Sequence, residues 1–292
     1  MTRFGARSST STLKKVQLTP PGNHSKMEYQ AAGWLPHSDN AAQNQFQTYV
    51  ELLKSQGVAV SVTPQAPRDN PDAIYAYDNV LVLPQGAVIF RSCKRNRCEE
   101  WKHCTRDMMT MGIPIIAQIK APAAIDGGDV FWLDRHTLAV GLSWRTNEAA
   151  IHQLRLVLEP MGIQIECFDL PNVNGKSECL HLMSLISPIN SSLALIEPRF
   201  IPVRLLKALD ERNIDTIHAV PEEFDTLSTN VLALDAQRVI ALSQNTQTNQ
   251  LLRQAGLTVI PFEAPDLCVA GTGGPTCLTR IIYREDKADF ES

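Results

Sequence analysis

The chain has 292 residues, of which 44% are apolar and 20% are charged, as in an ordinary soluble globular protein. A formal net charge of −4 leaves no excess of Lys and Arg for phosphates, so nucleic acid is not an expected partner. No apolar run reaches the roughly 18 residues that would span a membrane, so a membrane partner is not expected either.

The N-terminal segment, residues 1–15, is basic and rich in Ser and Thr but has no apolar stretch. It therefore does not resemble a secretory signal, and we expect a frayed tail, with a transit peptide as the alternative. The remaining residues, 16–292, are expected to form a single catalytic domain.

Seven cysteines at irregular spacings favour free thiols in a reducing compartment, which predicts a cytoplasmic protein. Cys93, Cys98, His103 and Cys104 lie close together in a basic segment. They contain no CxxC pair, so we expect a solvated helix start there and no metal site.

Apolar runs come in pairs around turn residues, which predicts four β-hairpins. The hairpins are expected at 78–91, 129–143, 180–198 and 229–243, with turns at 84–86, 134–136, 188–191 and 235–237.

Each hairpin is followed by a helical stretch and one more apolar run, so the repeated unit is β-β-α-β with a period of about 50 residues. The helices are expected at 99–111, 147–161, 202–213 and 246–255. In the second of them, Ile151, Leu154 and Leu158 recur at helical spacing.

A fifth unit is divided between the two ends of the chain. The C-terminal run at 277–283 supplies one strand, and the N-terminal part supplies a strand at 14–20, a helix at 41–55 and a strand at 58–64. Joining the ends closes a ring of five, so we predict a five-bladed α/β propeller with its helices outside.

Polar residues fall at equivalent positions of these units, at the expected start of each first strand. In a ring, these positions meet at one end of the axis although they are far apart in sequence. They are Asp78, Asp126, Asp129, His181, Asn230 and Cys277. A thiol, an imidazole and carboxylates together are the apparatus of nucleophilic catalysis.

The sequence resembles the guanidino-group-modifying (pentein, amidinotransferase-related) superfamily from about Val16 to Tyr283, and within it the dimethylarginine dimethylaminohydrolases most. The matching motifs are "PDAIYAYD" (71–78), "IDGGDV" (125–130), "GLSWRTN" (141–147), "LHLMS" (180–184) and "GGPTCLT" (273–279). Their order and spacing are specific for the superfamily and less so for the substrate.

The resemblance implies catalytic roles for three residues. Cys277 would be the nucleophile, His181 the general acid and base, and Asp126 the catalytic carboxylate.

The resemblance also implies a substrate pocket. Asp72 and Asp78 would hold the guanidinium or the α-amine of a small guanidino substrate. Arg97 and Arg145 would clamp its α-carboxylate, and the backbone near Gly271 would line the pocket. Asp72, Asp78, Arg97, Arg145 and Gly271 are thus the expected substrate-binding residues.

The implied reaction is hydrolysis of N-methylated arginine to citrulline and methylamine or dimethylamine, through a covalent S-alkylthiouronium on the cysteine. The substrate itself supplies the electrophile, so no metal or organic cofactor is expected. Three alternatives remain: an arginine deiminase-like hydrolase of free arginine or another guanidine that releases ammonia, an amidinotransferase, and a propeller retained as a binding protein. The oligomeric state is left open, with a homodimer among the alternatives.

Two positions depart from the related patterns. Tyr77 stands where dimethylarginine hydrolases have an acidic residue, and Met183 stands where arginine deiminases have an aspartate. We expect these two residues to decide which guanidine is used. The family's mobile lid is expected at 19–34, where Pro20, Pro21 and Gly22 interrupt regular structure.

Overall fold

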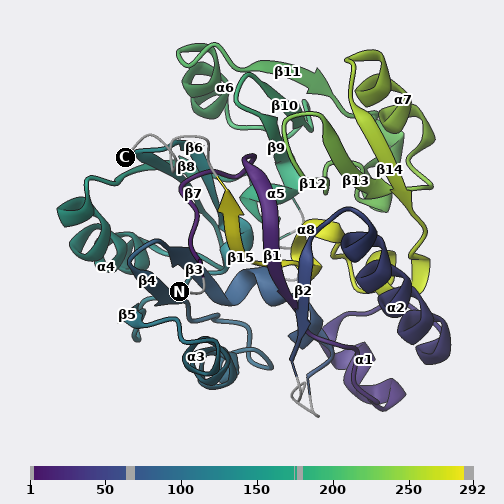
Figure 1. Cartoon of the computed structure of the whole chain (residues 1–292), viewed down its shortest axis with the longest axis horizontal. Coiled ribbons are helices and arrows are strands. Elements are labelled where there is room, and N and C mark those ends of the chain that lie inside the picture. The colour runs from purple at the N-terminus through teal and green to yellow at the C-terminus, as the bar shows by residue number, and fades with distance from the viewer. Residues whose placement is uncertain (1–2, 64–69, 174, 176–179, 286–292) are drawn as a thin grey trace.

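The computed structural model describes residues 3–63, 70–173, 175 and 180–285. Its strands form small sheets of three that are arranged around a common centre, with longer helices at the periphery (Figure 1). In each sheet the middle strand runs antiparallel to the strand on one side and parallel to the strand on the other. The expected five-unit α/β propeller is confirmed.

Four sheets follow the chain in order, one for each hairpin and the strand after the next helix. They are β3 (Val80–Leu83), β4 (Gly86–Ile89) and β5 (Ile115–Gln118); β6 (Val130–Asp134), β7 (Thr137–Leu142) and β8 (Gln164–Asp169); β9 (Ile186–Asn190), β10 (Leu193–Ile196) and β11 (Asp215–His218); and β12 (Leu232–Ala233), β13 (Arg238–Leu242) and β14 (Thr258–Phe262).

The fifth sheet joins the two ends of the chain, as the sequence predicts. Its middle strand β1 (Thr12–Leu18) pairs with β15 (Arg280–Glu285) on one side and with β2 (Ala59–Val62) on the other. Pairing of the first strand with the last closes the ring.

One helix covers each sheet on the outside of the ring (Figure 1). These helices are α2 (Asp39–Ser55), α3 (Glu100–Thr110), α4 (Glu148–Leu158), α6 (Val203–Asp210) and α7 (Thr246–Gln254). Each buries one apolar face, and in α4 that face includes Ile151, Leu154 and Leu158, as the periodicity predicts. Gly112 and Gly162 end the helical stretches of the first two units in the left-handed conformation, where glycine costs least.

Shorter helical segments lie between these elements. They are α1 (Lys26–Ala32), η1 (Pro71–Ile74), η2 (Ala76–Asn79), η3 (Gly127–Asp129), η4 (Glu159–Met161), α5 (Leu182–Leu185), η6 (Pro221–Thr226), η7 (Pro265–Val269) and α8 (Pro275–Leu278).

Two expectations are wrong, one about the N-terminal segment and one about the third hairpin. Residues 3–15 are not a frayed tail, because Gly5 bridges Tyr283 and Ala6 N–H donates to the carbonyl of Val82. The segment is therefore part of the ring closure; residues 1 and 2 lie outside the described chain. The third hairpin turns later than expected, at 191–192, since Pro188 lies within β9 and pairs with Ala194 of β10.

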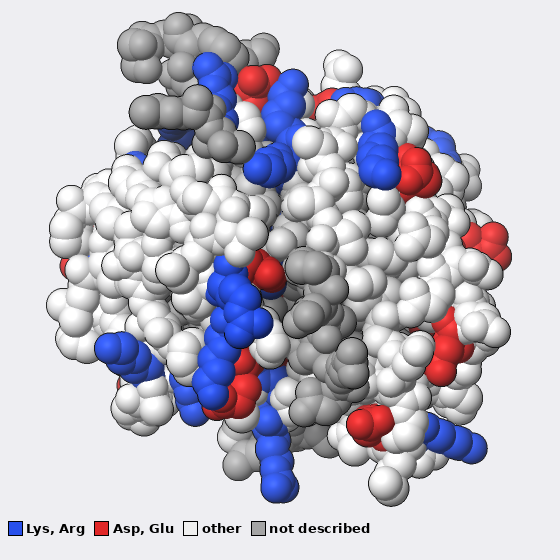
Figure 2. All heavy atoms as spheres, turned by 60° about the horizontal axis from the view of Figure 1, so that its bottom comes forward, with Lys and Arg blue, Asp and Glu red and all other residues white. Residues whose placement is uncertain are grey.

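The surface carries charges of both signs. On the face in Figure 2, Lys and Arg side chains are interspersed with Asp and Glu. None of the helices in the described ranges is both long and apolar enough to cross a bilayer. Six cysteines are free thiols, and Cys179 lies outside the described residues.

Candidate active site

A short helical turn precedes the first strand in four of the five units, and the three candidate catalytic residues and the expected substrate ligand Asp78 lie on or beside these turns. Asp78 lies in η2 and Cys277 in α8, while Asp126 and His181 immediately precede η3 and α5. Contacts of η2 with both η3 and α8, and of α5 with η3, place the turns side by side. The four residues therefore meet as expected, but ahead of their strands rather than at the strand starts.

His181 and Asp126 form a buried pair at this end of the ring. Nε2 of His181 lies 3.2 Å from Oδ2 of Asp126, and the same oxygen lies 3.5 Å from Nη1 of Arg145. Asp126 is fully buried, whereas the His181 side chain keeps 20% of its surface exposed. The imidazole is thus held by Asp126 and still keeps part of its surface exposed.

The charges of this pair favour a protonated imidazole. Burial alone would lower the pKa of His181, but the carboxylates of Asp129, Asp126 and Asp78 outweigh it and raise the pKa to about 9. Burial alone would raise the pKa of Asp126, and the hydrogen bond and charge of His181 instead lower it to about 2. At neutral pH the site therefore holds an imidazolium against a carboxylate.

The "GGD" motif fixes the position of His181. A Cβ on Gly128 would lie 2.6 Å from Nδ1 of the imidazole, so only glycine lets the ring pack against this backbone. Asp129 accepts the backbone N–H of Leu182 at 2.9 Å and the hydroxyls of Ser143 and Thr146. The motif thus anchors the turn that carries His181.

Cys277 has a neutral hydrogen-bond donor of its own. Nδ2 of Asn230 lies 3.0 Å from Sγ of Cys277, and Oδ1 of Asn230 accepts the N–H of Thr276 at 3.0 Å. Burial and the charge of Asp78 raise the pKa of the thiol to about 11, against the lowering effect of Asn230. The repeat positions bring Asn230 to the site, but nothing in the sequence gives it this role.

Arg97 does not have the free guanidinium that a carboxylate clamp needs. It is 3% exposed, and its N–H groups donate to Asp78 at 2.5 Å, to both oxygens of Glu100 and to the carbonyl of Tyr75. The expected clamp role of Arg97 therefore does not fit this arrangement. Since Oδ1 of Asp78 accepts the N–H of Gly128 at 2.8 Å, both oxygens of Asp78 have protein partners too.

Asp72 is also occupied, by donors from two segments. Oδ1 accepts the indole N–H of Trp34 at 2.9 Å, and Oδ2 lies 2.5 Å from Nζ of Lys94 and 2.8 Å from Nδ2 of Asn96. Lys94 also donates to the carbonyl of Ala32 at 2.9 Å. In this structure Asp72 thus holds residues 32–34 in place and does not present an unoccupied carboxylate to a substrate.

The segment expected as the lid leads into Trp34, which packs beside Asp72 and Gly271. It contains α1, capped by Ser25 and ended by Gly33, and then Trp34, which is 8% exposed. A Cβ on Gly271 would lie 1.9 Å from the hydroxyl oxygen of Tyr75 and 2.6 Å from the ring of Trp34. Gly271 therefore borders Tyr75 and Trp34, and the bare backbone is what lets both aromatic rings reach it. Its contact with a substrate stays a prediction.

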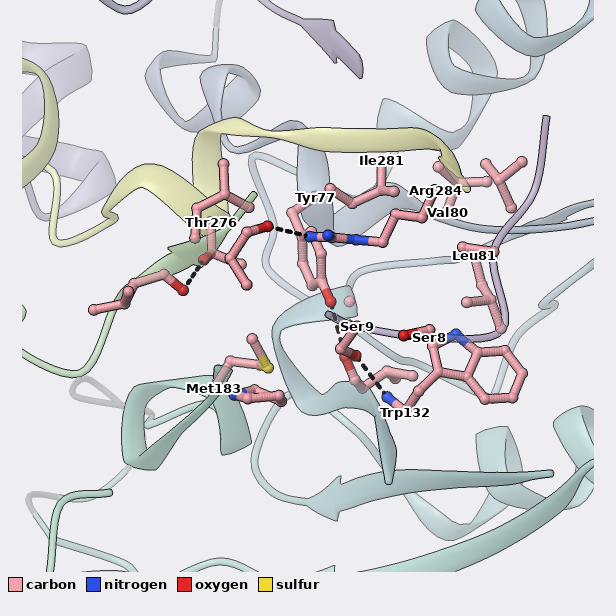
Figure 3. Close-up of a pocket in the computed structure, with 18 of the residues that line it drawn as sticks. Ser8, Ser9, Tyr77, Val80, Leu81, Trp132, Met183, Thr276, Ile281 and Arg284 are labelled. Atoms are coloured by element: carbon pink, nitrogen blue, oxygen red, sulfur yellow. Dashed lines mark hydrogen bonds between the residues drawn. The ribbon is translucent and has the colours of Figure 1, made fainter. Parts of the chain in front are cut away.

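Tyr77 and Met183 line a common cavity. Gly127 and Thr276, which adjoin Asp126 and Cys277 in the chain, line it too (Figure 3). The hydroxyl of Tyr77 donates to the carbonyl of Val130 at 3.1 Å, and burial raises the pKa of the phenol above its ordinary range. The hydroxyl of Tyr77 is thus engaged by the protein backbone, and its role in the choice of guanidine, like that of Met183, stays a prediction.

Solved structures share this architecture. The dimethylarginine dimethylaminohydrolase of Pseudomonas aeruginosa, a cysteine-to-serine mutant complexed with citrulline, matches 93% of this chain and 100% of its own with a TM-score of 0.75 at 19% identity. The N-terminal domain of ArgZ, an arginine dihydrolase of cyanobacteria, covers 91% and 97% with a TM-score of 0.78 at 17% identity. The fold is therefore that of the pentein, or guanidino-group-modifying, superfamily.

The family within that superfamily follows from sequence. Residues 25–284 match the family described as N,N dimethylarginine dimethylhydrolase, eukaryotic, and the chain belongs to this family. A curated relative, the N(G),N(G)-dimethylarginine dimethylaminohydrolase of Streptomyces coelicolor, is 28% identical over 244 residues, which are 82% of this chain and 84% of the relative.

Proposed function

We propose that this protein is a cysteine-dependent hydrolase of N-methylated arginine, which it converts to citrulline and methylamine or dimethylamine. The observation that carries the proposal is the convergence of Cys277, His181 and Asp126 on adjoining turns. The family and the Streptomyces relative support the choice of a methylated arginine over other guanidines.

Asp126 offers the acceptor that a guanidinium needs. Its Oδ1 is buried and has no hydrogen-bond partner within the described residues, whereas Oδ2 faces His181. A buried carboxylate oxygen without a donor is costly, and a guanidinium N–H would satisfy it with a charge-assisted bond. We infer that Asp126 orients the substrate as well as the imidazole.

The thiol then adds to the guanidinium carbon. With the pKa of Cys277 raised to about 11, the resting group is a thiol. The cation of a bound substrate beside it favours the thiolate, and the thiol proton is released to solvent. The Sγ–C bond forms, and one C–N bond breaks as the leaving amine takes a proton from the His181 imidazolium. The product of this step is the S-alkylthiouronium and a neutral imidazole.

Water completes the cycle. Neutral His181 removes a proton from water as it attacks the thiouronium carbon, and collapse of the tetrahedral adduct breaks the C–S bond. The released ureido group is that of citrulline. His181 keeps one proton of the water as the imidazolium, and the proton left on the hydroxyl of the adduct passes to the departing sulfur, which restores the resting thiol. Arg145, whose side chain is 19% exposed beside Asp126, is the better placed of the two expected arginines to meet the substrate's carboxylate.

Mass spectrometry of the products from a panel of guanidines tests the proposal. Separate incubations with asymmetric dimethylarginine, monomethylarginine and arginine should give citrulline from the methylated substrates, with dimethylamine or methylamine as the second product. Ammonia and citrulline from arginine alone would overturn the choice of substrate and support the deiminase alternative. The Cys277→Ser variant is the control, because it keeps the site but lacks the thiol.

A further inference from the structure

The ring encloses a cavity of about 60 Å³ beneath the catalytic turns (Figure 3). Its walls come from the first strands of several units and from the turns before them, so it lies along the axis of the ring. The N-terminal segment adds Ser8 and Ser9, and the last strand, β15, adds Arg284. The space suffices for a few water molecules or one small ion.

Arg284 brings a positive charge to this cavity without a matching negative one. It is 4% exposed, and its hydrogen-bond partners are backbone carbonyls, of Ser11 at 2.6 Å and of Ala233 at 2.9 Å. None of the described carboxylates forms an ion pair with it, in contrast to the buried Arg97, which has two. Burying a cation without a counter-charge costs free energy, so an anion bound beside Arg284 would stabilise the folded protein.

The pKa of Arg284 is consistent with a buried cation that lacks a counter-charge. Burial lowers the pKa of Arg284 to about 10, and the nearby phenol of Tyr77 opposes this only weakly. At neutral pH the side chain still carries its charge. Figure 3 shows the guanidinium beside Tyr77 and above Ser9 within the cavity.

Two hydroxyl groups of the N-terminal segment, those of Ser8 and Ser9, can donate a hydrogen bond into the cavity. Oγ of Ser9 accepts the backbone N–H of Trp132 at 2.9 Å, and Oγ of Ser8 accepts from Thr10 and Ser11. Because their oxygens already accept backbone hydrogens, each hydroxyl retains its own proton for a further acceptor. A guanidinium and two hydroxyl donors around a small cavity form a lining that suits an anion.

We propose that the axial cavity binds one small monovalent anion of the halide class, with Arg284 as its counter-charge and Ser8 and Ser9 as hydroxyl donors. Chloride is the physiological candidate. The ion would join the N-terminal segment to the last strand, the two parts of the chain that close the ring. The proposal does not depend on which substrate the enzyme uses, because Arg284, Ser8 and Ser9 are not among the expected catalytic or substrate-binding residues.

Anomalous diffraction from crystals grown in bromide tests the site directly. The expected result is an anomalous peak in the cavity within hydrogen-bond distance of Arg284 and Ser9. Water or an empty cavity at that position, in bromide at a concentration that saturates exposed halide sites, would overturn the proposal.

Thermal unfolding in potassium chloride and in potassium gluconate at equal ionic strength gives the second readout. The wild-type protein should gain a few degrees from chloride, with half-saturation at a defined concentration. In Arg284→Met the chloride-specific gain should vanish, and in Ser9→Ala the chloride affinity should fall roughly tenfold. Ser9→Ala keeps the test decisive if the Arg284 variant does not fold.

Arg212→Met is the matched control, since Arg212 pairs with Asp134 and Glu166 and lies outside the cavity. It should keep the full chloride effect. An equal chloride effect in the wild type, Ser9→Ala and Arg284→Met would show that the ion binds elsewhere and would contradict the proposal.

Discussion

Oδ2 of the fully buried Asp126 lies 3.2 Å from Nε2 of His181, although the two residues are 55 positions apart in the chain. The contact joins the second unit of the ring to the third. Together with the charges of Asp129 and Asp78, it raises the pKa of His181 to about 9, so the imidazole is charged at neutral pH. His181 is thereby prepared to act first as an acid and only afterwards as a base.

The pH dependence of turnover should reflect this order. A site that needs a protonated His181 and an ionised Cys277 has kcat/KM rising up to about pH 9 and falling above about pH 11, because the pKa values of the pair are about 9 and 11. The profile is measured with a methylated arginine, whose guanidinium does not titrate in this range. Its α-amine does titrate there, so the ionisation of the free substrate is measured separately and divided out. A maximum near pH 6.5 would contradict the raised pKa of the imidazole.

Removing the charge of Asp126 should change that titration. In Asp126→Asn the pKa of His181 should fall below about 9, because the variant loses a carboxylate that favours the imidazolium. NMR titration of the imidazole, assigned with a His181→Asn variant, measures the change without turnover. An unchanged pKa in Asp126→Asn would show that Asp129 and Asp78 alone set the charge of His181.

The same pair links pH to stability. Because the pKa of His181 is raised from 6.5 to about 9, its contribution to the free energy of unfolding is fully present below pH 6.5 and is lost as the pH rises through 9. The difference in stability between the wild type and His181→Ala, from urea unfolding at a series of pH values, should shrink over that window. A difference that stays constant across the same window would contradict the assignment.

Asn230→Ala should make the nucleophile less reactive. The variant loses the amide donor 3.0 Å from Sγ, so the thiolate is less stable and alkylation of Cys277 at a fixed pH below about 9 should slow roughly tenfold. Peptide mapping after iodoacetamide treatment separates Cys277 from the other thiols. Asn44→Ala, on the exposed side of α2, is the control and should react at the wild-type rate.

Arg97→Met should act on stability more than on substrate binding. Loss of the guanidinium leaves Asp78 and Glu100 buried without their cation, so the free energy of unfolding should fall by about 3–5 kcal/mol. The partly exposed pairs of Arg212 provide the comparison, and Arg212→Met should cost at most about 1 kcal/mol. A stable Arg97→Met protein with only a raised KM would restore the carboxylate-clamp role.

The five-unit fold of this protein can be predicted from the sequence, because the hairpin and helix patterns repeat along the chain. The repeat also brings Cys277, His181 and Asp126 together. The sequence pattern does not predict which buried charged side chains pair with one another. Nothing local to Arg97 or Asp72 shows that the first meets Asp78 and the second Lys94, since those pairings depend on how separate loops pack.

Two further features escape a sequence pattern for physical reasons. A four-residue turn such as α5 or α8 is too short to show a helical period, so the apolar pattern places strand starts at those residues instead. The N-terminal segment is fixed mainly by backbone hydrogen bonds, such as that from Gly5 to Ile282, which its polar composition does not reveal.

The covalent intermediate is the most direct test of the central claim. Enzyme mixed with a methylated arginine and quenched in acid within its first turnovers should show, by intact-protein mass spectrometry, the mass of the thiouronium adduct, and digestion should place it on Cys277. His181→Ala, which cannot activate water, should accumulate any adduct that it forms. Turnover to citrulline with no adduct on Cys277, or undiminished turnover by Cys277→Ser, would contradict the account.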